Sequence, residues 1–160
     1  MGQPYTADLC DKYGGKLHVA TPMFKNFGGA PGLGGPISTL QVFEDNSLVR
    51  STLGTPGNGR VLVVDGGGSM RCALVGGQLA EMAAKNNWAG IIVNGCIRDT
   101  HEIRELNIGV FALATHPQKS QKRNIGESDI PVSFSGVTFI PEHFVYADGD
   151  GIVVSDTALD

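Results

Sequence analysis

The most chemically suggestive residues lie in one short segment, residues 98–102 (RDTHE), which holds charges of both signs. The guanidinium of Arg98 is a forked cation that can bind a carboxylate through two parallel hydrogen bonds. The carboxylate of Asp99 supplies the oxygen atoms that hard divalent cations prefer. A structural alternative is that Asp99 or Thr100 caps a helix, with Glu102 completing a capping box. Because that alternative leaves Arg98 without a role, we predict a site for a metal and an anion together.

A second candidate site is the segment GGQL, formed by Gly76, Gly77, Gln78 and Leu79 at the expected start of a helix. The first backbone amides of a helix have no intrahelical partner, and the helix dipole favours negative charge there. These four amides could therefore cradle a carboxylate. The alternative is that the two glycines only interrupt the chain before the helix.

The glycine-rich segment DGGGS, residues 65–69, could bring backbone amides close to an anion. However, the sequence lacks GxGxxG and GxxxxGK[ST], and Val93, which ends the next strand, is followed by Asn94 and not by an acidic residue. Dinucleotide or adenosylmethionine binding is therefore disfavoured against a purely structural strand exit. Nucleophilic catalysis by Ser69 is disfavoured as well, because the GxSxG motif is missing.

The segment HPQKSQKR, residues 116–123, gathers three cations, Lys119, Lys122 and Arg123. Such a run usually forms a solvated loop. The alternative is that it meets an acidic partner or a neighbouring subunit.

The apolar runs between these segments predict an α/β fold in which strands and helices alternate. At these lengths the strands must pair in parallel through crossover connections. The loops 65–76 and 94–99 then lie at the carboxyl edge of one sheet, where open α/β sheets usually bind ligands. The expected strands are residues 37–43, 61–64, 91–93 and 110–113, and the expected helices are residues 45–53, 77–86 and 100–106.

The two ends of the chain follow other patterns. Residues 6–13 predict a short helix capped by Thr6, and the glycine-rich residues 22–36 predict an ordered loop. After Pro131, four closely spaced apolar runs predict a β-meander with a tight turn at residues 148–151. These runs are residues 132–134, 137–140, 144–147 and 152–154.

The composition excludes several classes of protein. A chain of 160 residues with 41% hydrophobic residues predicts one domain, residues 1–160, with a real core. The net charge of −4 disfavours direct nucleic-acid binding. Three cysteines without CxxC spacing predict neither a disulfide scaffold nor a zinc site. No apolar run approaches about 18 residues, so we expect no membrane contact and a cytoplasmic location. The start satisfies the loose N-myristoylation pattern MGxxx[ST], without a second anchoring signal.

The whole chain resembles a known family through the stretch from VLVVDGGGS to NGCIRDTHEI, the early PMFKNFGG and the late FVYADGDGIVVS. This is the family of regulator of ribonuclease activity A (RraA) and its relatives, the class II 4-hydroxy-4-methyl-2-oxoglutarate aldolases. The diagnostic aldolase pattern is a glycine, twenty residues, Arg-Asp, two residues and an acidic residue. Gly77, Arg98, Asp99 and Glu102 match that register.

The resemblance implies a three-layer β/β/α swivelling-type fold with a parallel sheet core, assembled as a homotrimer with sites between subunits. It implies that Asp99 binds Mg²⁺ or Mn²⁺, that Arg98 contacts the substrate, and that the amides of Gly76, Gly77, Gln78 and Leu79 hold the carboxylate of a small 2-oxo acid. Arg98 and Asp99 are then the catalytic residues. A metal chelated by the 2-oxo acid acts as a Lewis acid and stabilises the pyruvate enolate, so no lysine Schiff base is required.

Two functions are compatible with the resemblance. The first is cleavage of 4-hydroxy-4-methyl-2-oxoglutarate or 4-carboxy-4-hydroxy-2-oxoadipate to pyruvate, with oxaloacetate decarboxylation as a secondary activity. The second is non-catalytic inhibition of a ribonuclease E-type endonuclease, since other members of the family regulate that enzyme. The Asp99 retained here favours catalysis. The general base is not identifiable from the chain; Glu102, Asp148 and Asp150 are candidates for a supporting role, each with a structural alternative.

Overall fold

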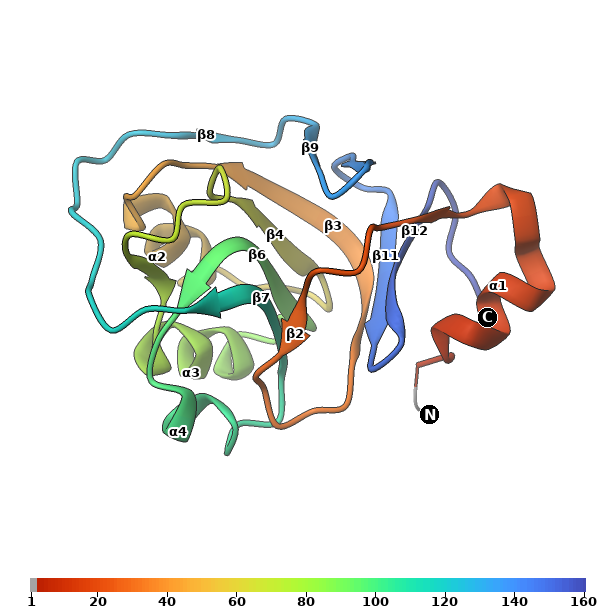
Figure 1. Cartoon of the computed structure of the whole chain (residues 1–160), viewed down its shortest axis with the longest axis horizontal. Helices are drawn as coiled ribbons and strands as arrows, with labels where there is room; N and C mark the ends of the chain where they lie inside the picture. The colour runs from red at the N-terminus through yellow and green to blue at the C-terminus, as the bar shows by residue number, and fades with distance from the viewer. Residues whose placement is uncertain (1–2) are drawn as a thin grey trace.

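The computed structural model describes residues 3–160, so the Met1-Gly2 start of the N-myristoylation pattern lies outside the described residues. Its backbone forms a mixed sheet with helices on one face (Figure 1). Two β-hairpins lie on the other side, one of them separate and one continuous with the main sheet. Two hydrophobic cores separate these layers, one between the sheet and the helices and one between the sheet and the hairpins. The predicted α/β fold with β/β/α layers is thus confirmed.

Four parallel strands form the centre of the sheet, as the apolar runs predicted. β3 pairs with β4, β4 with β6, and β6 with β7, all in parallel. Successive side chains of these strands alternate between the two cores: Leu62 and Val64 face the helices, whereas Val61 and Val63 face the hairpins. Burial on both faces explains why the strands read as continuous apolar runs. The strands are β3 (Leu33–Gln41), β4 (Val61–Asp65), β6 (Gly90–Ile97) and β7 (Gly109–Thr115).

The helical layer consists of α2 (Ser47–Leu53), α3 (Gly77–Lys85) and α4 (Thr100–Ile103). The helix predicted from residue 77 is confirmed, and the one predicted from residue 45 begins at Ser47. The helix predicted over residues 100–106 is shorter, because the chain turns after Ile103 to enter β7. Backbone amides of Leu106 and Ile108 donate to the carbonyls of Ile103 and Leu106 in that turn.

The glycine-rich residues 22–36 are not only a loop, as predicted, but contain the strand β2 (Lys25–Asn26) and the first residues of β3. β3 changes partners within its length: Leu33–Pro36 pair with β11, and Ile37–Gln41 pair with β4. Glycine is required in this strand for close packing, since a Cβ on Gly34 would lie 2.8 Å from the Tyr146 ring. Composition alone hides a strand of this kind.

The four C-terminal strands form two separate hairpins, so the prediction of one continuous meander is wrong. β9 (Val132–Phe134) and β10 (Val137–Phe139) pair only with each other. β11 (Phe144–Asp148) and β12 (Gly151–Ser155) join the main sheet beside β3. Between the hairpins Pro141 has no amide to donate, and Glu142, with a φ of 73°, donates its amide to Ile37 of β3.

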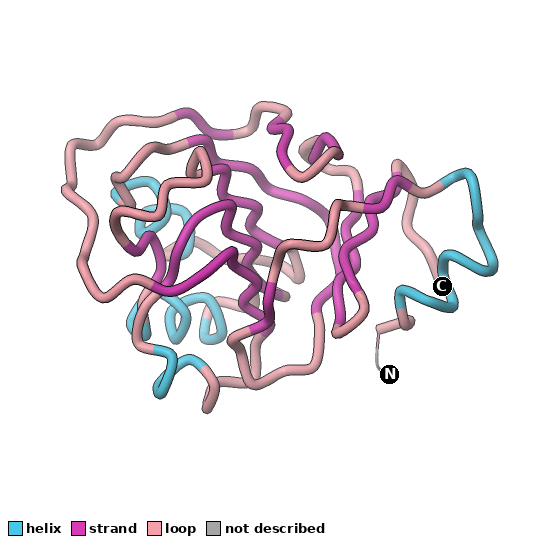
Figure 2. Tube along the Cα trace, viewed as in Figure 1, coloured by secondary structure: helices cyan, strands magenta, loops and turns pink. Residues whose placement is uncertain are grey.

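The helix α1 (Thr6–Tyr13) lies at the far side of the β11–β12 hairpin, as Figures 1 and 2 show. Leu9 packs there against Tyr146 and Val153. Thr6 does not cap this helix as predicted, because its amide and hydroxyl both donate to Asp148. The short elements η1 (Gly14–Lys16), β1 (His18–Val19), β5 (Ala73–Val75) and β8 (Glu127–Ser128) complete the fold. Across residues 3–160, every helix is too short or too polar to cross a membrane.

Candidate functional site

A polar pocket of about 250 Å³ lies at the carboxyl edge of the parallel strands. Its walls come from the ends of β5 and β6, the helices α2, α3 and α4, and the loop of residues 116–126, here called the cation loop. The structure thus brings together the two predicted segments around residues 76–79 and 98–99. The pocket is lined by Asn46, Arg50, Ala73, Gly76, Gln78, Leu79, Arg98, Asp99, Glu102, Lys119 and Lys122.

Asp99 is held in an uncommon backbone conformation directly after β6. Its φ of 60° and ψ of 44° place it in the left-handed region, which aspartate tolerates better than most residues. Its side chain makes no capping hydrogen bond to α4; instead its Oδ2 accepts a hydrogen bond of 2.8 Å from the amide of Gly77. The structural alternative of a capping Asp99 is therefore wrong, and the carboxylate points to the start of α3.

Gly76 and Gly77 allow the β6–α4 turn to approach the start of α3 closely. A Cβ on Gly76 would lie 2.7 Å from Oδ2 of Asp99, and one on Gly77 would lie 2.8 Å from Oε2 of Glu102. The glycines are therefore needed for this contact and do more than interrupt the chain. The amide of Gly77 is engaged by Asp99, which leaves those of Gln78 and Leu79 without a hydrogen-bond acceptor among the described residues. Binding of a carboxylate by these amides stays a prediction.

Arg98 is half-buried beside Asp99 and links the strand end to the cation loop. Its amide donates to the carbonyl of Val75, which fixes the backbone against β5. Its Nη1 lies 3.4 Å from the carbonyl oxygen of Pro117, a long hydrogen bond. Most of the guanidinium donors therefore stay available for an anion in the pocket.

The donor atoms in this pocket fit a hard divalent cation. The acidic and amide oxygens of Asp99, Glu102 and Asn46 line it, and oxygen ligands suit Mg²⁺ and Mn²⁺. In residues 3–160 no three or more His, Cys, Asp or Glu side chains are grouped to hold a metal. Mg²⁺ commonly takes one or two carboxylates and completes its shell with water and substrate oxygens. Asp99 and Glu102 are the two carboxylates of the pocket that could hold such an ion.

The hydrogen bonds of the DGGGS segment fit the alternative of a purely structural exit from β4. Oδ1 of Asp65 accepts hydrogen bonds from the amide of Gly67 and the side chain of Asn94, both at 3.0 Å. The hydroxyl of Ser69 donates to Glu44 at 2.6 Å, and within residues 3–160 it forms no hydrogen bond with a histidine. Hydrogen bonds from Arg71 and Ser69 lower the pKa of Glu44 below its ordinary value. These bonds give the segment the role of a strand exit.

Of the acidic residues considered for a supporting role, only Glu102 lies in this pocket. Asp148 accepts hydrogen bonds from Thr6 and Asp150 and so anchors the start of α1. Burial raises the pKa of Asp148, but these hydrogen bonds outweigh burial and lower it overall. The carboxylate of Asp148 therefore has a structural role, and Asp150 contributes its backbone amide to the same turn.

Sequence reasoning did not assign Asn46, Arg50, Lys119 and Lys122 to the pocket. The cluster of cations in residues 116–123 was a usable signal, but nothing local tied it to residues 98–99. Asn46 donates from Nδ2 to the carbonyl of Leu74, and its buried Oδ1 has no partner among the described residues. Buried acceptors normally have a donor, so Oδ1 is a place for a hydroxyl or water donor.

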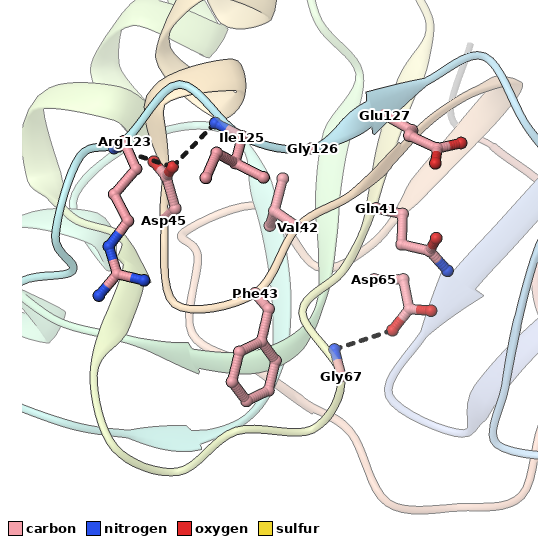
Figure 3. A pocket seen from close by; sticks show the side chains of 10 residues that line it. All are labelled: Gln41, Val42, Phe43, Asp45, Asp65, Gly67, Arg123, Ile125, Gly126 and Glu127. Carbon is pink, nitrogen blue, oxygen red and sulfur yellow. Dashed lines mark hydrogen bonds between the residues drawn. The ribbon is translucent and has the colours of Figure 1, made fainter.

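A larger hollow of about 590 Å³ lies on the other side of Asp45 and the cation loop (Figure 3). It contains none of residues 76–79, 98 and 99, which all belong to the predicted 2-oxo acid site. Asp45 is 2% exposed and accepts hydrogen bonds from the amides of Ser47, Arg123 and Ile125 and from the Ser47 hydroxyl. Burial raises the pKa of its carboxyl, but these hydrogen bonds outweigh burial and lower it from 3.8 to about 2.

We expect Asp45 to make stability depend on pH below about 5. A pKa lower in the folded than in the unfolded chain stabilises the fold above pH 3.8, and this contribution is lost as the pH falls through about 2. The free energy of unfolding should lose about 2 kcal/mol of this contribution between pH 5 and pH 2. Urea unfolding of the wild type and of Asp45→Asn at several pH values measures the contribution of Asp45. Asp148 titrates in both proteins, so its effect cancels in the difference between their free energies of unfolding. A difference between the two proteins that stays constant with pH would contradict the prediction.

The sequence matches the RraA-like family, described as Aldolase/RraA, over residues 6–154. A protein of Aromatoleum aromaticum is 59% identical over 96% of this chain and 97% of its own. One from Cupriavidus taiwanensis is 56% identical over 99% of both chains. The names of both assign them provisionally as 4-hydroxy-4-methyl-2-oxoglutarate aldolases.

Solved structures share the fold over nearly the whole chain. The RNA-processing inhibitor RraA from Thermus thermophilis is 45% identical with a TM-score of 0.94, covering 99% of this chain and 96% of its own. A Geobacillus kaustophilus protein titled as an S-adenosylmethionine:2-dimethylmenaquinone methyltransferase is 48% identical with a TM-score of 0.95, covering 98% and 97%. Streptomyces coelicolor RraAS2, titled as an unusual member of the RNase ES inhibitor family, is 27% identical with a TM-score of 0.73, covering 93% and 78%.

Proposed function

Because the chain belongs to the RraA-like family, we propose that it is a divalent-metal-dependent carbon–carbon lyase that releases pyruvate. The proposed substrate is 4-hydroxy-4-methyl-2-oxoglutarate or 4-carboxy-4-hydroxy-2-oxoadipate, and oxaloacetate decarboxylation is the proposed secondary activity. Mg²⁺ or Mn²⁺ is the proposed cofactor. The same resemblance extends the proposal to a homotrimer, which light scattering of the purified protein measures.

One observation carries the proposal: Arg98 and Asp99 meet the start of α3 in a single polar pocket. A cation-binding carboxylate, a forked anion-binding cation and free helix amides are the groups that a 2-oxo acid needs. The pocket also carries the basic side chains of Arg50, Lys119 and Lys122, so cations outnumber carboxylates. This balance supports a substrate with more than one negative charge.

Each residue of the proposed site would have its own role in binding the substrate or the cation. Arg98 would hold the carboxylate of the 2-oxo acid, and the amides of Gln78 and Leu79 would donate hydrogen bonds to it. Asp99 would hold the divalent cation, which polarises the 2-oxo group as a Lewis acid. In the net reaction of 4-hydroxy-4-methyl-2-oxoglutarate, the bond between C3 and C4 breaks, the 4-hydroxyl loses its proton and C3 gains one. Two molecules of pyruvate result.

A coupled assay for pyruvate tests the proposal directly. We expect the purified protein to release pyruvate from 4-hydroxy-4-methyl-2-oxoglutarate with Mg²⁺ or Mn²⁺, to stop when EDTA is added, and to resume when excess metal is restored. The restoration step controls for damage by the chelator. No pyruvate from this substrate, from its 4-carboxy relative or from oxaloacetate would overturn the lyase proposal, and activity unaffected by EDTA would overturn its metal dependence.

Inhibition of a ribonuclease E-type endonuclease is the second candidate function. The observation in its favour is the likeness to the RNA-processing inhibitor from Thermus thermophilis over nearly the whole chain. A pull-down with such an endonuclease tests it, and absence of binding at micromolar concentration would contradict it. The two functions are compatible in one protein, so each assay is read independently.

A further inference from the structure

The cation loop, residues 116–126, crosses the carboxyl edge of the sheet between β7 and β8 (Figure 1). Its chain lies between the site pocket and the larger hollow: Lys119 and Lys122 line the pocket, whereas Arg123 and Ile125 line the hollow. The loop has almost no regular structure of its own, so its position depends on what anchors it.

Two sets of contacts supply that anchor. The first part of the loop pairs with β5, where the amide of Ala73 donates to the carbonyl of Gln118 at 2.8 Å and Ala73 forms a β-bridge with Lys119. Hydrogen bonds from the segment before α2 hold the later part. Oδ2 of Asp45 accepts from the amides of Arg123 at 2.9 Å and Ile125 at 3.1 Å, and Figure 3 shows both bonds. The Arg123 side chain extends away from Asp45, so Asp45 binds the loop through its backbone. The amide of Asn46 donates to the hydroxyl of Ser120 at 3.1 Å. If the cations of the loop were simply solvated, the loop would not require a buried carboxylate such as Asp45 to bind its backbone.

Lys119 and Lys122 lie in the pocket together with Arg98 and Asn46. Arg98 reaches the loop through the carbonyl of Pro117. Asn46, whose backbone amide bonds the loop at Ser120, also lines the pocket, and its Oδ1 is buried without a partner among the described residues. The loop side of the pocket therefore offers two lysine cations.

We propose that the cation loop is the subsite for the second carboxylate of the substrate, bound by Lys119 and Lys122, and that Asp45 is the positioning residue that holds the Lys122 part of the loop there. This inference rests on the proposed function, because it assigns the half of the substrate that Arg98 and Asp99 do not bind. It makes the loop the determinant of preference for dicarboxylic over monocarboxylic 2-oxo acids.

Binding of two ligands tests the lysines without turnover. In calorimetry with Mg²⁺, pyruvate probes the 2-oxo acid half alone, and 2-oxoglutarate adds a second carboxylate. Lys119→Gln combined with Lys122→Gln should weaken 2-oxoglutarate about tenfold and leave the Kd of pyruvate unchanged. Lys85→Gln is the matched control, because Lys85 is an exposed cation at the far end of α3 and pairs with Glu81. It should change neither Kd.

The anchor is tested with Asp45→Asn, whose amide group cannot accept all the hydrogen bonds that the carboxylate accepts. This variant should lose affinity for 2-oxoglutarate selectively, as the lysine variant does, and trypsin should cut it faster after Lys119, Lys122 or Arg123. Ser47→Ala removes one partner of Asp45 and also the acceptor of the Asn124 amide in the same loop, so it should show the same changes at smaller size. Faster cleavage without the selective loss of 2-oxoglutarate would overturn the positioning role.

The outcomes separate this proposal from the one on which it rests. If pyruvate binds with metal but the lysine variant weakens both ligands equally or neither, the subsite proposal is wrong and the proposed function stands. If pyruvate does not bind to the wild-type protein, both proposals fall. Selective weakening of 2-oxoglutarate in the lysine and Asp45 variants supports the subsite.

Discussion

Asp99→Asn is expected to lower kcat/KM for pyruvate release by about three orders of magnitude. Asparagine keeps the size of the side chain and tolerates the left-handed backbone at this position, so the fold should persist. The neutral amide is a poor ligand for a hard cation, and loss of the Lewis acid removes several kcal/mol of transition-state stabilisation. Steady-state kinetics measures the loss, and Mn²⁺ binding followed by electron paramagnetic resonance should weaken in parallel.

The control for this variant is Glu81→Gln, which neutralises an exposed carboxylate on α3 that pairs only with Lys85 among the described residues. Its kinetics and Mn²⁺ affinity should match the wild type, since exposed ion pairs of this kind contribute little. Wild-type turnover by Asp99→Asn would show that the cation is held elsewhere. Unchanged Mn²⁺ affinity with lost turnover would assign Asp99 a role other than metal binding.

Gly76→Ala is expected to lower kcat/KM about 100-fold while the protein stays folded. The backbone of Gly76 is extended, with a φ of −121°, so alanine is compatible with its conformation. The added Cβ would lie 2.7 Å from Oδ2 of Asp99 and must displace that carboxylate. A displacement of about 1 Å in a catalytic group commonly costs a factor of about 100. Kinetics at saturating metal separates this loss from weak metal binding.

Gly149→Ala is the matched glycine control, because a Cβ there meets no described atom within 4 Å. Its kinetics should stay within about twofold of the wild type, since substitutions away from such contacts have small effects. Equal activity of Gly76→Ala and Gly149→Ala would show that Asp99 does not need its present position. Thermal unfolding of both variants reports whether either loses activity by unfolding.

The fold was predictable where residues obey a local rule. Runs such as residues 61–64 and 91–93 are apolar without alternation, as expected for strands buried on both faces. The strand in residues 33–36 was missed because glycine and proline dominate it, and both are depleted in strands. The strand in residues 25–26 was missed because its lysine and asparagine are depleted in strands as well. What makes residues 33–36 a strand is pairing with β11, more than one hundred residues later.

The separation of the two C-terminal hairpins depends on a contact of the same long-range kind. Local patterning marks four strands, but it does not say which neighbours they take. Residues 142 and 143 exchange backbone hydrogen bonds with Ile37, which belongs to β3. Partner choice of this kind depends on the whole sheet and leaves no periodic signal nearby.

The candidate site was likewise predictable from the sequence only in part. The pairing of Arg98 with Asp99 was readable from the residue types, because the two residues are adjacent in the sequence. Their link to Gly77 was implied by the resemblance to the aldolase pattern. The direction of the Asp99 carboxylate could not be predicted, because the sequence is equally compatible with capping of α4 and with a contact to Gly77. A left-handed backbone at Asp99 settles that direction.

The sequence by itself determined the alternation of strands and helices, the family, and two segments that meet in the candidate site. The tertiary structure decided which distant residues complete it. Lys119 lies in the pocket where its strand-like backbone pairs with Ala73 of β5, and Lys122 lies there next to the loop backbone that the buried Asp45 binds. Local propensity acts over a few residues, whereas such contacts are selected by sheet order, strand register and the need to pair buried polar groups.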